Sequence, residues 1–343
     1  MIDFRRGREK AVLVVVAVVC VVLLSVHYMH RPQSMAAPQP AQVKSLQASV
    51  PQFAVPQFVV PQGRARPASV PTLHPSVNVV KSYPREELPY KDCVPLPRSP
   101  NPDVKICVYP KQDDIYVSKT LKGGRLFESD LVLQMAQALK ADPSLQFIDF
   151  GANIGVYTMF AAACGKTVLS VEMLPANIHQ IQNSLAVSGL SEQVTLVNNA
   201  LFSDHRSLTA NFIRENVGAT HLNVSKTNFA RYGMKEDNSH TVTVNTICID
   251  DLIPLLKLRK VFIKIDIERT EARALSCAHK FFDEVDVRII QMEWLAKSQE
   301  EITSINQFML EHGFTASRTA LKYTPVNTNV ATTPGSNVFF IRV

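Results

Sequence analysis

One short stretch, residues 146–158, limits the folds open to this chain more than any other. It reads QFIDFGANIGVYT: an apolar run leads through Asp149 to a turn containing Gly151, Asn153 and Gly155, and a segment of helical composition follows. In α/β proteins, a strand that ends in a glycine turn and opens a helix presents backbone N–H groups to a ligand. Glycine suits such a turn because it has no Cβ and tolerates positive φ. The stretch therefore predicts an α/β fold with a ligand loop.

The chain from residue 101 to 343 supports this fold class, because short apolar runs alternate there with helical stretches. We expect parallel strands at residues 147–150, 167–171, 194–197, 261–267 and 287–292, a hairpin of 208–212 with 241–246, and an antiparallel pair of 314–317 with 337–342. We expect helices at residues 130–140 (capped by Ser129), 156–164, 175–187, 250–256, 271–282 and 302–312.

The N-terminus predicts a membrane anchor. Residues 1–10 carry four basic side chains, and an uncharged run, residues 11–29, follows them. A helix of this length spans a thin bilayer, and the preceding basic residues orient the N-terminus towards the cytosol. The alternative is a signal peptide cleaved after residue 36, which would release a secreted protein. Both interpretations place the remaining chain in the lumen or outside the cell.

Residues 30–100 predict a disordered, proline-rich spacer. Fourteen of the 21 prolines lie between Pro32 and Pro100, and this density opposes both helix and sheet. The folded domain is then residues 101–343.

Charge and cysteine usage narrow the partners and the compartment. The net charge is +6, but residues 1–85 hold ten basic and two acidic side chains, so the folded part is slightly acidic. This argues against a nucleic-acid partner. Cys93 and Cys107 are candidates for a disulfide in an oxidising lumen, whereas Cys164, Cys248 and Cys277 are expected to be buried thiols. Residues 223–225 form a glycosylation sequon.

Asp149 and Glu172 indicate the kind of ligand. They sit at the C-terminal ends of two successive predicted strands, and an acid at the end of the second strand is where a nucleoside ribose offers its hydroxyls. NAD(P) and S-adenosylmethionine both contain such a ribose. The loop reads DxGxNxG instead of GxGxxG, and its acid would repel a pyrophosphate but suit the positively charged amino-acid end of S-adenosylmethionine. The pattern therefore favours a methyltransferase over a dehydrogenase.

Longer motifs resemble the FkbM family of S-adenosylmethionine-dependent O-methyltransferases over roughly residues 105–342. The matching stretches are FIDFGANIGVYT, VEMLP, NNALFSD at 198–204, FIKIDIERTEARAL at 262–275 and QMEW at 291–294. The resemblance implies a Rossmann-like class I methyltransferase fold, with a doubly wound, seven-stranded, mostly parallel sheet. The chain departs from the family pattern at Arg269, where glycine is usual; a turn that needs positive φ would strain arginine.

The resemblance also implies roles for individual residues. The cofactor would contact Asp149, Gly151, Asn153 and Gly155 at its methionine end, Glu172 at the ribose, and Asn199 and Ala200 near the adenine. The catalytic and acceptor-binding candidates are Asp266, Glu293, Glu268 and Lys264. Asp266 or Glu293 is expected to act as the general base, with bound Mg²⁺ as the alternative. Glu128 is a further candidate for acceptor contact, although nothing in its sequence surroundings singles it out.

Anchor, spacer and lumenal domain together resemble the layout of Golgi enzymes that modify glycans. We therefore expect a single-pass membrane protein of the Golgi that methylates a glycan hydroxyl. Two alternatives stay open: a lumenal methyltransferase for a lipid or a small hydroxylated metabolite, and an inactive cofactor-binding module.

Overall fold

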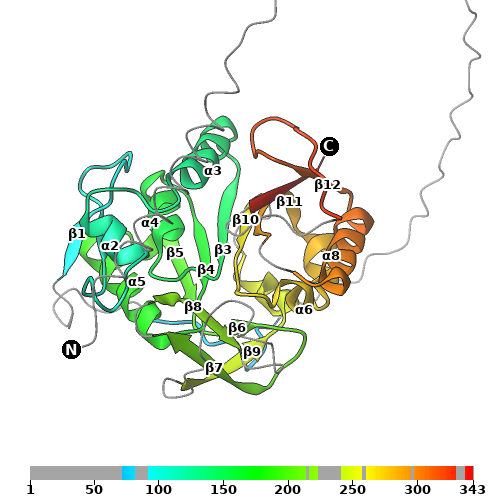
Figure 1. The fold of residues 1–343 in the computed structure, drawn as a ribbon, viewed down its shortest axis with the longest axis horizontal. Helices are drawn as coiled ribbons and strands as arrows, with labels where there is room; N and C mark the ends of the chain where they lie inside the picture. The colour runs from blue at the N-terminus through cyan, green and yellow to red at the C-terminus, as the bar shows by residue number, and fades with distance from the viewer. Residues whose placement is uncertain are drawn as a thin grey trace, which may run out of the picture. The chain divides into compact units, whose positions relative to one another are not determined.

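The structure, a computed structural model, describes residues 72–81, 92–213, 216–222, 241–256, 260–294, 297–329 and 337–342 (Figure 1). The predicted cytosolic tail, anchor helix and sequon lie outside these ranges. Within them, no helix has the length and apolar character needed to cross a membrane.

A seven-stranded sheet forms the centre of the fold. Its strands are β3 (Gln146–Phe150), β4 (Val168–Val171), β5 (Val194–Val197), β10 (Lys260–Ile265), β11 (Asp286–Glu293), β12 (Phe314–Ser317) and β13 (Asn337–Arg342), in the spatial order β12-β13-β11-β10-β3-β4-β5. All neighbours are parallel except β13, which is antiparallel to both β11 and β12. The predicted doubly wound, mostly parallel sheet is confirmed.

The strand order marks where a ligand should bind. From β3 the chain moves outwards through β4 to β5, and it later returns to the other side of β3 as β10. In such sheets ligands bind at the carboxyl ends of the strands where the order reverses. Here that point lies between β3 and β10.

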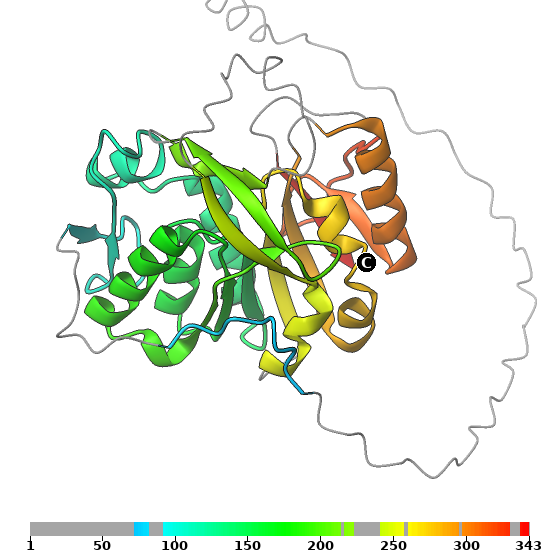
Figure 2. The ribbon, with the colours of Figure 1, turned by 90° about the horizontal axis from the view of Figure 1, so that it is seen from below.

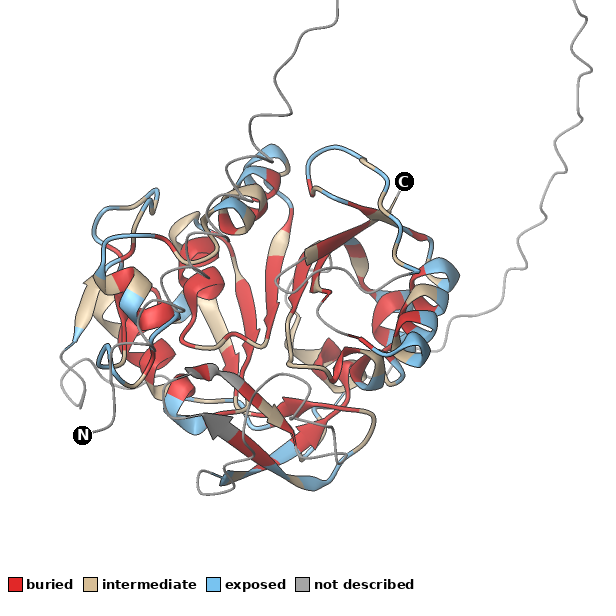
Figure 3. Cartoon of the chain, viewed as in Figure 1, coloured by how far each residue is buried: buried red, intermediate tan, exposed pale blue. Residues whose placement is uncertain are grey.

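Helices cover both faces of the sheet (Figure 1). One face packs against α2 (Val117–Lys122), α3 (Ser129–Ala141), α4 (Val156–Ala163) and α5 (Pro175–Ser188), and the other against η4 (Ile249–Leu255), α6 (Glu271–Leu275), α7 (His279–Glu284) and α8 (Gln299–Glu311). Successive residues of β3 point to opposite faces of the sheet: Phe147 belongs to the apolar core under α2–α5, and Ile148 belongs to the core under η4 and α6–α8. Because both faces are covered, the central strands are buried almost throughout (Figure 3).

The helix predicted at residues 271–282 is wrong in one respect: α6 and α7 are separate helices. Between them lies Cys277, which forms a disulfide with Cys248 just before η4. The expectation that both cysteines are buried thiols is therefore wrong. The pairing of Cys93 with Cys107 is confirmed; it joins β1 (Cys93–Pro95) to β2 (Lys105–Cys107).

The Cys248–Cys277 disulfide should stabilise the domain. It closes a 29-residue separation, so the loop-closure model gives about 3–4 kcal/mol. We expect the double substitution of Cys248 and Cys277 to serine to lower the free energy of unfolding by this amount in urea titrations. Serine at Cys164, the free cysteine of the described chain, is the matched control. Equal effects of the two changes would contradict the stabilising role.

A smaller sheet contains four strands: β6 (Ala200–Leu201), β7 (Ser207–Ile213), β8 (Asn216–Leu222) and β9 (Thr241–Ile247), in the order β6-β9-β7-β8. The predicted antiparallel pairing of β7 with β9 is confirmed, but β8 was not anticipated. Viewed from below, this sheet lies across the front of the domain (Figure 2).

Residues 72–81, which we name the strap, run as an extended segment along the domain (Figure 2). Val80 N–H donates to Leu196 O (2.8 Å), and Asn198 N–H donates to Asn78 O (2.9 Å), so the strap uses the free edge of β5. Val77 packs into the main core. The prediction of a disordered spacer over residues 30–100 is therefore wrong for the strap and for β1, because a chain without regular structure still docks through its backbone.

Candidate functional site

A pocket lies at the carboxyl ends of β3 and β10, the position that the strand order marks. Eight of the predicted site residues line it: Gly151, Asn153, Glu172, Asn199, Ala200, Lys264, Asp266 and Glu268. Three do not: Asp149, Gly155 and Glu293.

The loop after β3 needs glycine for two separate reasons at Gly151. Its φ is +82°, and a Cβ built there would lie 1.8 Å from the carbonyl oxygen of Asp266. The two loops that follow β3 and β10 therefore touch, and only a residue without a side chain fits between them. Gly155, with φ of +90°, begins α4 and packs against Ile181 instead of facing the pocket.

Glu172 follows β4 and is held by the glycine loop. Asn153 N–H donates to its Oε2 (2.8 Å), while Leu174 N–H (2.9 Å) and Asn177 Nδ2 (3.2 Å) donate to its Oε1. Burial raises the pKa of this carboxyl to about 7, against the opposing effect of these donors. Glu172 is thus a buried acceptor at the pocket wall whose charge changes near neutral pH.

Asn153 offers a further acceptor beside Glu172. Its φ is +54°, a left-handed conformation that asparagine tolerates better than most residues. Its buried Oδ1 has no hydrogen-bond partner among the described residues, although Asn153 lines the pocket. A donor group of a ligand would satisfy it.

Asp149 lies beneath the pocket and does not line it. Thr158 donates to its Oδ2 from both N–H (3.1 Å) and Oγ1 (2.7 Å), which ties the end of β3 to α4. Its Oδ1 is 3.9 Å from Lys264 Nζ. Burial raises the pKa of Asp149, and Lys264 opposes that rise. Asp149 therefore supports the loop and Lys264 from below.

Lys264, on β10, is the buried cation at the centre of the site. Its Nζ donates to Gly151 O (3.1 Å), lies 3.3 Å from Asp266 Oδ2, and sits 5.2 Å from the centre of the Tyr157 ring. Burial alone would lower the pKa of Lys264, but the carboxylates around it, Asp266 first, outweigh burial and raise it. Lys264 thus stays charged and holds the glycine turn against the acids.

Glu128 is a site residue that the sequence did not distinguish. We predicted Ser129 as the cap of α3, but Glu128 occupies that position with φ of +49° and makes no side-chain capping bond. Its Oε2 instead accepts the Tyr157 hydroxyl (2.9 Å), which in turn accepts Gln291 Nε2 (2.9 Å). Burial raises the pKa of Glu128, and Asp266 adds to the rise. A strained backbone that places a half-buried acid in a pocket wall is typical of functional sites.

The turn after β10 confirms that Arg269 stands where positive φ is required. Glu268 and Arg269 have φ values of +52° and +74°. Ile267 N–H (3.3 Å) and Arg269 N–H (3.4 Å) both donate to Glu271, whose other oxygen pairs with Lys297 at 2.8 Å. Both partners of this ion pair are almost fully buried. Glu271 therefore holds the strained turn in place.

Glu268 and Glu293 share an acidic environment beside this turn. Burial raises the pKa of Glu268 well above its ordinary value, and the neighbouring Asp266 and Glu293 add to the rise. Burial, followed by Asp266, raises the pKa of Glu293 to about 8. Only Glu268 of the two lines the pocket.

Asn199 forms pocket wall, but its polar atoms serve the strap. Its Oδ1 accepts Asn78 N–H (2.8 Å), and its Nδ2 donates to Ser76 O and Asn245 O, each at 3.1 Å. The strap thus supports the part of the pocket formed by Asn199 and Ala200. Sequence reasoning missed this link because it joins segments more than 120 residues apart.

Comparisons with known proteins point to one family. Residues 149–316 match the model of the methyltransferase FkbM domain. A structure of magnesium protoporphyrin IX methyltransferase from Synechocystis PCC 6803 with bound S-adenosylmethionine is 14% identical, covering 66% of this chain and 84% of that one, with a TM-score of 0.35. A precorrin-6y C5,15-methyltransferase from Geobacter metallireducens is 14% identical (62% and 86% covered, TM-score 0.33).

A third solved structure, an S-adenosylmethionine-dependent O-methyltransferase from Thermotoga maritima, is 12% identical, covering 66% of this chain and 71% of that one, with a TM-score of 0.32. Comparison with the curated proteins gives no match. The family match covers the glycine loop, Glu172, the turn after β10 and β11, and the strand order is that expected for a class I methyltransferase. The chain contains an FkbM-family methyltransferase domain whose cofactor is S-adenosylmethionine.

Proposed function

We propose that this methyltransferase transfers its methyl group to a hydroxyl of a glycan in the secretory pathway. The observation that carries the oxygen specificity is the position of Glu128 and Asp266, two carboxyl groups that line the same pocket as the glycine loop. A hydroxyl acceptor must lose its proton, and a carboxylate within hydrogen-bond reach can accept it.

The pocket residues fit the cofactor. The turn at Gly151 admits a ligand against the backbone, and Asn153 Oδ1 offers an acceptor for the ammonium group of the methionine end. Glu172, when ionised, accepts hydroxyl donors of the ribose. The wall formed by Asn199 and Ala200 would lie beside the adenine. The bound cofactor supplies the activated methyl group.

Methyl transfer forms a C–O bond to the acceptor and breaks the S–C bond, whose electron pair stays on sulfur. The acceptor proton goes to a carboxylate of the pocket. Glu293 does not line the pocket, so the candidates are Asp266 and Glu128. Burial raises the pKa of Glu128, which makes its carboxylate a stronger base than an ordinary glutamate. If Mg²⁺ activates the hydroxyl instead, chelation abolishes transfer and added Mg²⁺ restores it.

The compartment part of the proposal is supported by two disulfides, Cys93–Cys107 and Cys248–Cys277, which suit an oxidising lumen. The uncharged run at residues 11–29 and the proline-rich residues after it suit a single-pass anchor and spacer. A Golgi location follows from this arrangement, or secretion if residues 1–36 are removed. Glycans are the abundant hydroxylated acceptors of that compartment.

A second candidate, an apolar hydroxylated acceptor such as a lipid, is favoured by one observation. Four apolar side chains line the pocket at its outer elements: Val117, Phe127, Val217 and Leu222. Two of them come from β8, the strand that the sequence did not predict.

We expect the affinity for S-adenosylmethionine to depend on pH. The ribose binds ionised Glu172, whose pKa is about 7, so binding competes with protonation below that value. Affinity should then fall by up to about tenfold per pH unit below 7 and level off above it. Calorimetric titrations of the full chain at pH 6, 7 and 8 measure this, and equal affinities at pH 6 and 8 would exclude the role of Glu172.

The acceptor test uses the full chain with S-adenosylmethionine carrying a labelled methyl group, offered to separate panels of glycans and of hydroxylated lipids. We expect label on a glycan hydroxyl, lost by about 10²–10⁴-fold in Glu128→Gln or Asp266→Asn while cofactor affinity is retained. Glu300→Gln, an exposed acid on α8, is the control. Label on lipid alone would favour the second candidate. Cofactor binding without transfer to either panel would indicate an inactive binding module.

A further inference from the structure

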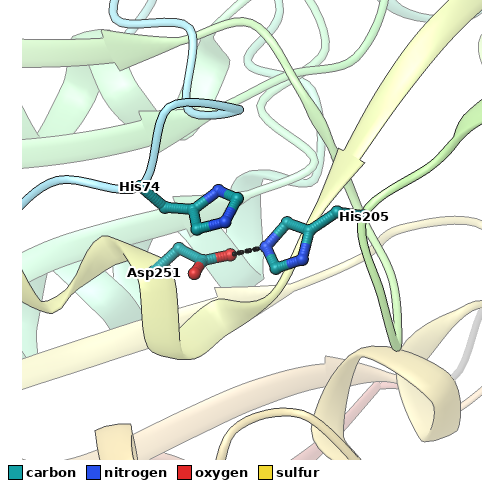
Figure 4. Close-up of side chains that lie close together, drawn as sticks. All are labelled: His74, His205 and Asp251. Carbon is teal, nitrogen blue, oxygen red and sulfur yellow. Dashed lines mark hydrogen bonds and ion pairs between the residues drawn. The ribbon is translucent and has the colours of Figure 1, made fainter.

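A second cluster of potential ligand side chains lies outside the pocket. His74, on the strap, faces His205, after β6, and Asp251, on η4 (Figure 4). One ligand atom from each lies within 4.8 Å of the other two. Among the described residues, this is the one group of three histidine, cysteine or acidic side chains that meets so closely. Three segments far apart in the sequence therefore converge on one point.

The domain holds two of these side chains in a fixed orientation. Asp251 Oδ2 accepts the Cys248 N–H (2.8 Å) within the capping box of η4, directly beside the Cys248–Cys277 disulfide. His205 Nε2 lies 2.7 Å from the same oxygen, and the His205 ring stacks on His74 with 3.9 Å between ring centres. His205 and Asp251 remain partly exposed, so an ion can reach them.

We propose that His74, His205 and Asp251 bind a Zn²⁺ ion that fastens the strap to the methyltransferase domain. Two imidazoles and a carboxylate, with water as the fourth ligand, form the open type of tetrahedral zinc site. With bonds of ~2.0–2.2 Å, the ligand atoms of such a site are about 3.4 Å apart. The ligand atoms lie within 4.8 Å of one another, so binding requires them to draw closer, and the exposed His205 side chain has room to move.

The remaining polar groups near the cluster are compatible with this set. Asp250, the neighbour of Asp251 in the sequence, is engaged elsewhere: its Oδ1 accepts Phe281 N–H (2.7 Å). The proposed set therefore contains three protein ligands. The cluster borders an open hollow lined in part by Pro75, Pro254 and Lys280, which leaves room for a water ligand. In the arrangement described, the Ser76 N–H donates to His74 Nδ1 (3.2 Å).

That hydrogen bond has a consequence for binding. A ring nitrogen that accepts a hydrogen bond carries no proton, so neutral His74 carries its proton on Nε2. Zinc at Nε2 therefore moves the ring proton to Nδ1 and frees the Ser76 N–H. Binding also displaces the proton that His205 Nε2 donates to Asp251.

The ion would act on the pocket through the strap. Ser76 and Asn78 lie two and four residues beyond His74, and Ser76 O and Asn78 N–H bond to the side chain of Asn199, which lines the pocket. Fastening His74 restrains the strap next to this wall. The role is structural, so its primary readout is stability.

The test uses the untagged full chain after removal of metal by EDTA and dialysis. We expect calorimetry with ZnCl₂ to show one site per chain with a Kd on the order of 1 µM or tighter, and MgCl₂ to show none, because imidazole ligands favour Zn²⁺. At saturating Zn²⁺ the midpoint of thermal unfolding should rise by about 5 °C.

His74→Phe, which retains an aromatic ring on the strap, and His205→Asn should each abolish the calorimetric site and the zinc-induced rise in midpoint. For each variant, the midpoint of thermal unfolding in EDTA is compared with the midpoint of the same variant in Zn²⁺. A general loss of stability lowers both midpoints and so does not imitate the loss of zinc binding. His179→Asn, on α5 and outside the cluster, should keep both signals. The proposal is overturned if the unaltered chain does not bind Zn²⁺, or if His74→Phe and His205→Asn bind it as the unaltered chain does.

Discussion

Gly151→Ala should lower the free energy of unfolding by about 3 kcal/mol or more and abolish binding of S-adenosylmethionine. Two costs add at this position. Alanine is strained at φ of +82°, and its Cβ would lie 1.8 Å from Asp266 O, a backbone atom that cannot move aside without moving β10. Separating the loops after β3 and β10 also deforms the pocket that they form. Urea unfolding and calorimetry with the cofactor measure the two effects.

Gly165→Ala separates the two costs. Gly165 has a similar φ of +76°, but a Cβ there meets nothing within 4 Å. It should lose only about 1 kcal/mol, the penalty of the left-handed conformation, and bind the cofactor normally. If the two variants lost equal stability, the contact between Gly151 and Asp266 would not be the reason for glycine at this position.

Lys264→Met should destabilise the domain by about 3 kcal/mol at pH 7. Asp149 and Lys264 are both buried, and removing the cation leaves the buried Asp149 carboxylate with Thr158 as its hydrogen-bond partner. Breaking a buried pair on one side costs roughly 3–5 kcal/mol, whereas the net contribution of the intact pair is smaller. The measurement is urea unfolding of the variant and the unaltered chain.

The loss caused by Lys264→Met should shrink as the pH falls. In the folded protein the pKa of Asp149 lies above its ordinary value of about 4, and it rises further when Lys264 is removed. Folding therefore favours the protonated acid, so the penalty is present at high pH and disappears as Asp149 takes up a proton. Unfolding at pH 5 and pH 7 tests the sign; a larger loss at pH 5 would contradict it.

Lys260→Met is the matched control on the same strand. Lys260 pairs with Asp142, but each side chain is about one-third exposed, so water screens the pair. The expected change in stability is below about 1 kcal/mol.

The central sheet was predictable because its strands are buried on both faces. Such strands occur as short apolar runs, and the runs at β3, β4, β5 and β11 gave bounds within about a residue of those observed. The prediction of one long helix at 271–282 was wrong because nothing in the local sequence shows that Cys277 forms a disulfide where the helix is interrupted. β8 was missed because it is an outer strand of a small sheet, without a buried apolar run.

The cofactor side of the pocket was readable from local motifs, since the glycine turn and Glu172 belong to one strand–helix–strand unit. The acceptor side was not. Glu128 acquires its role from Tyr157 and Asp266, which only the fold brings near it. The strap was assigned to the spacer because it lies within the proline-rich residues 30–100, while the backbone bonds to β5 and Asn199 that hold it leave no sequence pattern.

The most direct test of the account is calorimetric titration of S-adenosylmethionine into the full chain at pH 8, where Glu172 is ionised. A truncation that starts after the strap is unsuitable, because it removes the partners of Asn199. The account predicts saturable binding at one site per chain, lost in Gly151→Ala and retained in Gly165→Ala. Absence of binding at millimolar cofactor by the folded, unaltered chain would contradict the assignment of the pocket.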